Sequence, residues 1–277
     1  MLAEDDLQNN TTSFTKKIFF LSGFARAGNT LLASLLNQNP DIACCANSLP
    51  MEAIKELFLL KKLDVFQNYP DHQSLDNILD TVYPTYYKNW NYKYIIDRTP
   101  AGTPGNLMLM RKHLKQPIKI IVLMRPLLEV LASFIKWSNK EPTAYINNHG
   151  KTAEEKCRWL MRKESHIWKQ IINIENLLKP ENRHLALFIQ YHDLVKKPRV
   201  ILNQIYKFLD IPTYKHRFIN LDQLKINGRS YNDEVLGHNL HTLYTSKIKL
   251  RTTSVKKLLP KTIIQEYCHL KWSVVSK

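Results

Sequence analysis

Glycine is scarce in this chain of 277 residues, with 7 Gly beside 13 Pro. These counts exclude collagen-like repeats and low-complexity sequence as the basis of the fold. Long apolar runs are also missing. The longest strongly apolar run, 118–124, contains a lysine and is far shorter than the roughly 20 residues needed to cross a bilayer. The sequence therefore predicts no membrane-spanning helix.

Cysteine is equally uninformative about metals or disulfides. The four cysteines form neither a CxxC pair nor a Cys/His cluster: Cys44, Cys45, Cys157 and Cys268. We therefore expect no metal site and no disulfide framework, only reduced thiols. The first residues, MLAEDDLQNNTTSFTKK, have acids where a secretory signal has Lys or Arg, and they lack an apolar core. We expect a cytoplasmic protein in which residues 1–16 form a flexible polar leader.

Acidic residues are few, and the charge balance is strongly positive. The chain has 40 Lys+Arg against 24 Asp+Glu, a formal net charge of +16, and 44% hydrophobic residues. It should fold around a proper core and bind an anionic partner. Nucleic acid, a phosphorylated cofactor, an acidic peptide or glycan, and an anionic membrane surface are all compatible with this charge. No run of five like charges occurs, which argues against a disordered basic tail that binds nucleic acid.

Short apolar runs alternate with helical patterns along the chain. Strands are predicted at 17–23, 92–96, 119–124 and 185–190, each followed by a loop and a helix. Further helices are predicted at 50–63, 74–89, 152–178 and 195–209. This alternation is typical of an α/β protein with an open parallel sheet. We expect one domain, 17–277, with a basic flank or lid from about residue 220.

Two loops at predicted strand ends can bind anions. The loop FARAGNT (24–30) opens a helix directly after a strand, so its backbone N–H groups and the helix dipole favour phosphate. A Walker A loop ends in Gly-Lys-Ser/Thr, but here Gly28 is followed by Asn29 and Thr30, and Arg26 supplies the charge. Arg125 ends a second strand, and Ser133 follows it in the next helix. Either feature alone is also compatible with an ordinary strand end.

Together these segments resemble the sulfotransferase family. The loop 24–30 resembles its 5′-phosphosulfate loop, and Arg125 with Ser133 resembles its 3′-phosphate motif. The stretch QYHDL (190–194), followed by YKFLDIP (206–212), is similar to a later family motif, in the same order. Because the loop carries Arg26 where the cytosolic aryl enzymes carry Lys, the chain looks closer to the tyrosylprotein-like and small bacterial or viral branches.

The resemblance implies a fold, a donor and a set of binding residues. The fold would be α/β, the P-loop-containing nucleoside triphosphate hydrolase-like three-layer α/β/α arrangement with a central parallel sheet. The donor would be 3′-phosphoadenylyl sulfate, released as adenosine 3′,5′-bisphosphate, and no metal would be needed. The implied nucleotide-binding residues are Arg26, Ala27, Gly28, Asn29, Thr30, Leu31, Arg125, Ser133 and Tyr191. The family's C-terminal region closes over the nucleotide, and its candidate here is 237–254, with Lys247, Lys249 and Arg251.

The resemblance also suggests catalytic residues. Arg26 would neutralise charge on the leaving phosphate, and Arg98 would take the place of a family Lys that steadies the transferring sulfuryl group. The general base is where the chain departs from the family, because the position of the expected Glu falls at 46–48, which contains no carboxylate. The alternatives are Glu52 and Asp97, with His113 and His192 behind them, while Asn47 would orient the acceptor.

Two other functions compete with a sulfotransferase. A kinase or ATPase would need the missing Gly-Lys-Ser/Thr and a carboxylate for Mg²⁺. A basic nucleotide- or nucleic-acid-binding protein without sulfotransferase activity would explain the charge, although no helix-turn-helix, RNP or zinc-finger pattern supports nucleic acid as the partner. The acceptor of a sulfotransferase would carry a hydroxyl or amine, and the positive charge is compatible with an anionic peptide, glycan or lipid head group. The sequence gives no indication of an oligomeric state.

Overall fold

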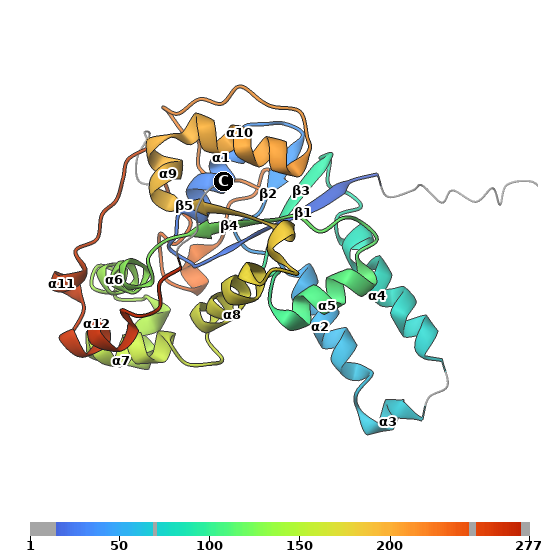
Figure 1. Ribbon diagram of the computed structural model, residues 1–277, viewed down its shortest axis with the longest axis horizontal. Helices are drawn as coiled ribbons and strands as arrows, with labels where there is room; N and C mark the ends of the chain where they lie inside the picture. Colours follow the sequence, from blue (N-terminus) through green and yellow to red (C-terminus); the bar gives the residue numbers. More distant parts are fainter. Residues whose placement is uncertain (1–14, 69–70, 244–247, 273–277) are drawn as a thin grey trace, which may run out of the picture.

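The computed structural model describes residues 15–68, 71–243 and 248–272. At its centre lies a parallel sheet of five strands in the order β2-β3-β1-β4-β5 (Figure 1). The strands are β1 (Lys17–Gly23), β2 (Ile42–Cys44), β3 (Tyr94–Arg98), β4 (Ile120–Met124) and β5 (Ala186–Gln190). All five residues of β4 are buried, as expected of a central strand that is covered on both faces.

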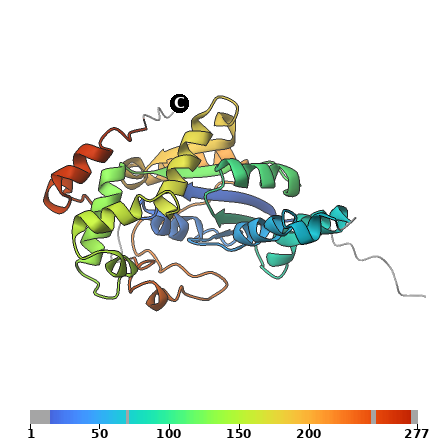
Figure 2. The ribbon, with the colours of Figure 1, turned by 90° about the horizontal axis from the view of Figure 1, so that it is seen from below.

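Helices cover both faces of the sheet. Figures 1 and 2 show α1 (Asn29–Leu36) on one face and α5 (Pro104–His113) and α8 (His166–Leu178) on the other. The contacts of β1 agree, because Ser22 donates hydrogen bonds to Gln170 and Asn173 of α8 at 3.3 and 3.0 Å. The predicted fold class, a three-layer α/β/α arrangement with a central parallel sheet, is therefore confirmed.

The remaining helices form two groups around this centre. In Figure 1, α2 (Pro50–Leu60), α3 (Asp64–Gln67) and α4 (His72–Tyr86) project away from the sheet. On the opposite side α6 (Leu127–Ser138) and α7 (Ala153–Leu160) pack with the C-terminal helices α11 (Val255–Leu258) and α12 (Lys261–Tyr267). The other helices are α9 (Tyr191–Lys196) and α10 (Pro198–Leu209), with 3₁₀ turns at η1 (Tyr145–His149), η2 (Arg183–Leu185) and η3 (Asp233–Val235).

The sequence patterns located most elements but misjudged several boundaries. The predicted helix 195–209 is broken at Lys197 (φ −132°, ψ 53°), because a proline disfavours helical geometry in the residue before it, and Pro198 begins α10. The predicted helix 152–178 is two helices, since the Ser165 side chain caps α8 by accepting a hydrogen bond from the Trp168 N–H. Strand β2 was not predicted, because three residues are too few to show a period.

Two predictions, the flexible leader and the single domain, are not tested by the structure. Most of the predicted leader, 1–16, lies outside the described residues, and the single-domain assignment stays a prediction. In the described parts of the chain, no helix is both long and apolar enough to cross a membrane.

Candidate functional site

The loop between β1 and α1 contains two residues with left-handed backbone geometry. Arg26 has φ 65° and Gly28 has φ 97°, both in the left-handed region. A side chain at position 28 would also collide with Tyr191, because its Cβ would lie 2.7 Å from Cδ2 of that ring. Glycine is therefore required there for two independent reasons.

The first turn of α1 presents donors at the end of this loop. The Leu32 N–H donates to the Gly28 carbonyl at 3.0 Å, so the N–H groups of Asn29, Thr30 and Leu31 precede the first intrahelical bonds. The Asn29 side chain holds the loop closed by donating to the Phe24 carbonyl at 2.8 Å. Ala27 differs from the prediction: it is buried, its N–H donates to the Phe24 carbonyl at 3.2 Å, and it is not among the residues lining the cavity described below. Its amide therefore shapes the loop.

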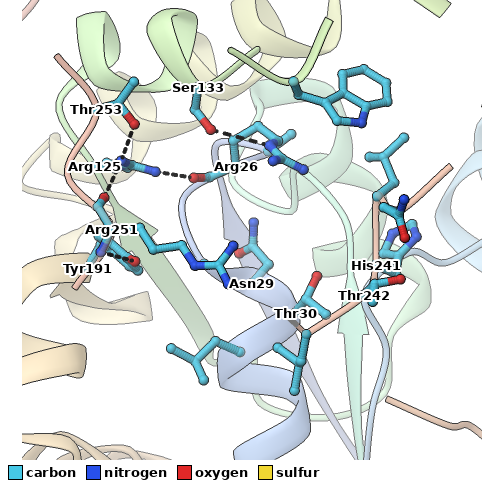
Figure 3. A pocket seen from close by; sticks show the side chains of 18 of the residues that line it. Arg26, Asn29, Thr30, Arg125, Ser133, Tyr191, His241, Thr242, Arg251 and Thr253 are labelled. Carbon is cyan, nitrogen blue, oxygen red and sulfur yellow. Dashed lines mark hydrogen bonds between the residues drawn. The ribbon is translucent and has the colours of Figure 1, made fainter. Parts of the chain in front are cut away.

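Arg125, at the end of β4, joins three parts of the site. Its Nη1 donates to the Arg26 carbonyl at 2.8 Å, and its Nη2 donates to the Arg251 carbonyl at 3.0 Å. Its Nε pairs with Glu129 at 3.1 Å, and its guanidinium lies 4.9 Å from the centroid of the Tyr191 ring. The side chain is buried, so it links the loop after β1 to the C-terminal segment (Figure 3).

Arg26 contacts Ser133, although the sequence paired Ser133 with Arg125. Arg26 Nε donates to Ser133 Oγ at 3.4 Å, and its guanidinium lies 5.9 Å from the Trp137 ring. Ser133, Trp137 and Lys140 recur on α6 and just beyond it at helical spacing, which places them on one side of the helix. This spacing is a signal that could have identified Trp137 and Lys140 as site residues from sequence.

These elements enclose a cavity of about 810 Å³ beside the carboxyl end of the sheet (Figure 3). Seven of its described lining residues are basic and one, Glu141, is acidic; the basic ones are Arg26, Arg98, Arg125, Lys136, Lys140, Lys249 and Arg251. Gly28, Asn29, Thr30, Leu31, Ser133 and Tyr191 also line it, so most of the predicted binding residues meet at one cavity. The predicted Lys247 lies outside the described residues.

Arg98 and Asp97 are neighbours in sequence but lie in different environments. Both belong to β3, where successive side chains point to opposite faces. Arg98 lines the cavity and donates from Nη2 to the Gly23 carbonyl at 2.7 Å, and within the described residues its Nε has no hydrogen-bond partner. Burial lowers the pKa of Arg98 to about 10, which leaves it charged at neutral pH.

Asp97 is fully buried on the other face. Its Oδ2 accepts a hydrogen bond of 3.0 Å from Tyr87 of the segment that follows α4, and burial raises its pKa to about 6. It does not line the cavity. As a candidate base, Asp97 would have to act through other groups.

The other candidate bases, and Asn47 as the residue predicted to orient the acceptor, also lie away from the cavity lining. Glu52 forms an ion pair with Lys55 on α2, and His113 is buried at 2.8 Å from Asp80. His192 lies 3.6 Å from Glu129, and Asn47 is exposed beside the end of β2. None of these four residues lines the cavity in the described parts of the chain. The structure thus does not bring the sequence-derived base candidates to it.

Sequence reasoning also missed a histidine that lines the cavity, His241. It lies in an irregular segment whose pattern predicts neither helix nor strand, so only its position after Gly237 in the basic C-terminal region could have drawn attention to it. Within the described residues, no cluster of three or more His, Cys, Asp or Glu side chains could hold a metal ion.

Fold and cavity together define an α/β protein with a cationic cavity at the carboxyl edge of a parallel sheet. The family model described as "Sulfotransferase domain" matches residues 16–270. The chain therefore belongs to the sulfotransferase family and is a transferase enzyme. Among curated proteins, none matches it.

Several solved structures are similar to this chain. The sulfotransferase domain of the Synechococcus PCC 7002 olefin synthase has 20% identity and a TM-score of 0.45, with 72% of this chain and 75% of that one covered. The sulfotransferase domain from the curacin biosynthetic pathway has 19% identity and a TM-score of 0.45, with coverages of 95% and 93%. A sulfotransferase from Alicyclobacillus acidocaldarius has 15% identity and a TM-score of 0.46, with coverages of 78% and 87%.

Proposed function

We propose that this protein transfers a sulfuryl group from 3′-phosphoadenylyl sulfate to a hydroxyl or amine of an acceptor. The observation that carries this proposal is the cavity at the first turn of α1, where seven basic side chains face one acidic side chain. A site of this kind suits a ligand with two separate anionic groups. Its volume of about 810 Å³ lies in the range of small-molecule pockets.

The donor's two anionic ends would bind at different places. The 5′-phosphosulfate would lie at the N–H groups of Asn29, Thr30 and Leu31, where the helix dipole favours negative charge. Arg26 and Arg98 line the cavity beside this turn and would neutralise charge on the leaving phosphate and the sulfuryl oxygens. The 3′-phosphate would lie near Arg125, Ser133 and Tyr191.

The C-terminal segment would complete the nucleotide site. Lys249 and Arg251 line the cavity, and the Arg251 main-chain N–H donates to Tyr191 Oη at 3.4 Å. Arg125 also donates to the hydroxyl of Thr253 at 3.4 Å. These contacts support a role for 248–253 as a cover over the nucleotide. An anionic acceptor stays a prediction from the excess of positive charge.

Calorimetric titration with adenosine 3′,5′-bisphosphate, ADP and ATP tests the donor. We expect the 3′-phosphorylated nucleotide to bind most tightly, equally well in EDTA and in Mg²⁺, and Arg125→Ala to weaken it. Arg111→Ala is the matched control, because Arg111 lies on α5 and donates to Asn182 away from the cavity. Equal affinity for all three nucleotides, or no binding, would overturn the proposal and leave the basic surface, with nucleic acid as its alternative ligand, to explain the charge.

A further inference from the structure

His241 reaches the cavity as part of a hydrogen-bonded pair with Asp233. Its Nδ1 lies 2.6 Å from Oδ1 of Asp233, and its main-chain N–H donates to Oδ2 of the same carboxylate at 2.8 Å. An ionised carboxylate only accepts hydrogen bonds, so Nδ1 must carry the proton. In the neutral imidazole the lone pair is then on Nε2, the nitrogen not engaged by Asp233.

The imidazole is also held from one side by an aromatic ring. Tyr231 stacks on His241 with ring centroids 4.4 Å apart and an interplanar angle of 24°. The Tyr231 hydroxyl accepts hydrogen bonds from the main-chain N–H groups of Ala46 and Asn47, at 2.8 and 3.2 Å. Burial raises the pKa of Tyr231 to about 12, so this hydroxyl stays neutral. The pair is thereby fixed to the segment 46–48, where the resemblance led us to expect a glutamate and the chain has none.

The position of His241 in the cavity suits the acceptor end. Figure 3 shows His241 and Thr242 on one side and Arg125, Tyr191 and Arg251 on the other, with Asn29 and Thr30 of α1 between them. If the donor binds as proposed above, its 3′-phosphate is on the Arg125 side and its phosphosulfate is at α1. The sulfuryl group would then be open to attack from the side on which His241 lies.

We infer that His241 is the general base of the transfer and that Asp233 is its positioning residue. This inference rests on the proposed function. As the acceptor oxygen forms a bond to sulfur, its proton passes to Nε2 of His241. The bond from sulfur to the 5′-phosphate oxygen breaks, and the electron pair leaves with adenosine 3′,5′-bisphosphate. The imidazolium is stabilised by Asp233 and returns its proton to solvent.

The other charged residues that line the cavity are less suited than His241 to act as the general base. The cations that line the same cavity include Arg26 and Arg98, which would attract the donor but cannot accept a proton at neutral pH. Glu141 is the acidic residue among the described lining, and within the described residues no hydrogen bond or ion pair fixes the orientation of its carboxylate. His241 is therefore the lining residue that combines a proton-accepting nitrogen with a fixed orientation.

The first test needs no acceptor. Nitrogen-15 spectra of the histidine rings, with the His241 signals identified by their loss in His241→Gln, should show the Nδ1–H tautomer in the intact protein. Asp233→Asn should weaken that preference, because an amide can donate as well as accept. A His241 ring protonated on Nε2 in its neutral form would overturn the inference.

The second test separates catalysis from binding. Consumption of radiolabelled 3′-phosphoadenylyl sulfate is measured with water as acceptor, beside the affinity for adenosine 3′,5′-bisphosphate. His241→Gln should lower kcat by about 10²–10⁴ with nucleotide affinity unchanged within about threefold. Asp233→Asn should lower kcat less, and His184→Gln, at an exposed histidine of η2, is the matched control.

The outcomes distinguish the two proposals. Absence of nucleotide binding by the intact protein would contradict the proposed function itself. Intact nucleotide binding with a kcat of His241→Gln close to that of the unaltered protein would contradict only the role of His241.

Discussion

Arg125 and Arg26 are joined by a hydrogen bond of 2.8 Å from the Arg125 guanidinium to the main-chain carbonyl of Arg26. The same guanidinium also bonds to Glu129, to the Arg251 carbonyl and to the Thr253 hydroxyl. Four interactions from one buried side chain thus connect the end of β4, the loop after β1 and the C-terminal segment. A residue expected to bind phosphate also assembles the cavity in which phosphate would bind.

Arg125→Lys should weaken binding of adenosine 3′,5′-bisphosphate by about 10- to 100-fold. Lysine keeps the charge but lacks the planar fork, and charge-assisted hydrogen bonds contribute about 1.5–3 kcal/mol each. Calorimetry with Arg111→Lys as the control measures the change. Unaltered affinity in Arg125→Lys would show that charge alone is sufficient at this position.

Gly28→Ala should destabilise the protein by about 1–3 kcal/mol, because alanine is strained at φ 97° and its Cβ would press on Tyr191. Gly105→Ala is the matched control, since no heavy atom lies within 4 Å of an added Cβ there and the residue is in helix α5. That control should be neutral or stabilising by up to about 1 kcal/mol. Chemical denaturation of both variants measures the difference, and equal stabilities would contradict the strained-turn geometry.

Lys249→Glu should lower nucleotide affinity by about tenfold at low salt, because it reverses one charge in a strongly cationic cavity. The effect should shrink as salt rises, since the Debye length falls from about 10 Å at 0.1 M to about 3 Å at 1 M. Lys256→Glu, at an exposed residue of α11 that does not line the cavity, is the control for net charge. A similar loss in both variants would place the effect in the overall charge and not in the cavity.

Asp97 should make the protein less stable as the pH rises from about 4 to 6. Its folded-state pKa of about 6 is above the ordinary value of 3.8, so between these values the native state binds more protons than the unfolded state. The stability lost through this window is about 3 kcal/mol.

Asp97→Asn should therefore remove this pH dependence while keeping an acceptor for the Tyr87 hydroxyl. Urea unfolding at pH 4.5 and pH 7 measures it, with Asp41→Asn as the control at a half-exposed carboxylate that pairs with Lys93. A free energy of unfolding with the same pH profile in Asp97→Asn and the unaltered protein would contradict the assignment.

Local sequence patterns predicted the parts of this protein that depend on local interactions. Apolar runs marked β1, β3, β4 and β5 within a few residues, and the loop 24–30 could be read as an anion site because its Gly, Asn and Thr stand where a helix begins. Strand ends also placed Arg125 and Arg98 at the carboxyl edge of the sheet. Most of the predicted lining residues lie at or directly after such strand ends, whereas Ser133 lies in α6 and Lys249 and Arg251 lie in the C-terminal segment.

Only the tertiary structure decided whether Asp97, Arg98 and His241 line the cavity. Whether Asp97 or Arg98 faces the cavity depends on where β3 begins and ends relative to its neighbours, since side chains alternate between faces. Asp233 lies in the short turn η3 and His241 in an irregular stretch after it, far along the chain from the loop at 24–30. No periodicity in this region predicts that the two residues pair. The sequence by itself determined four of the strands, the turn at 24–30 and the excess of positive charge, because these follow from local propensity and composition. Long-range packing alone decided that Glu141 and His241 line the cavity and that Asp97 does not.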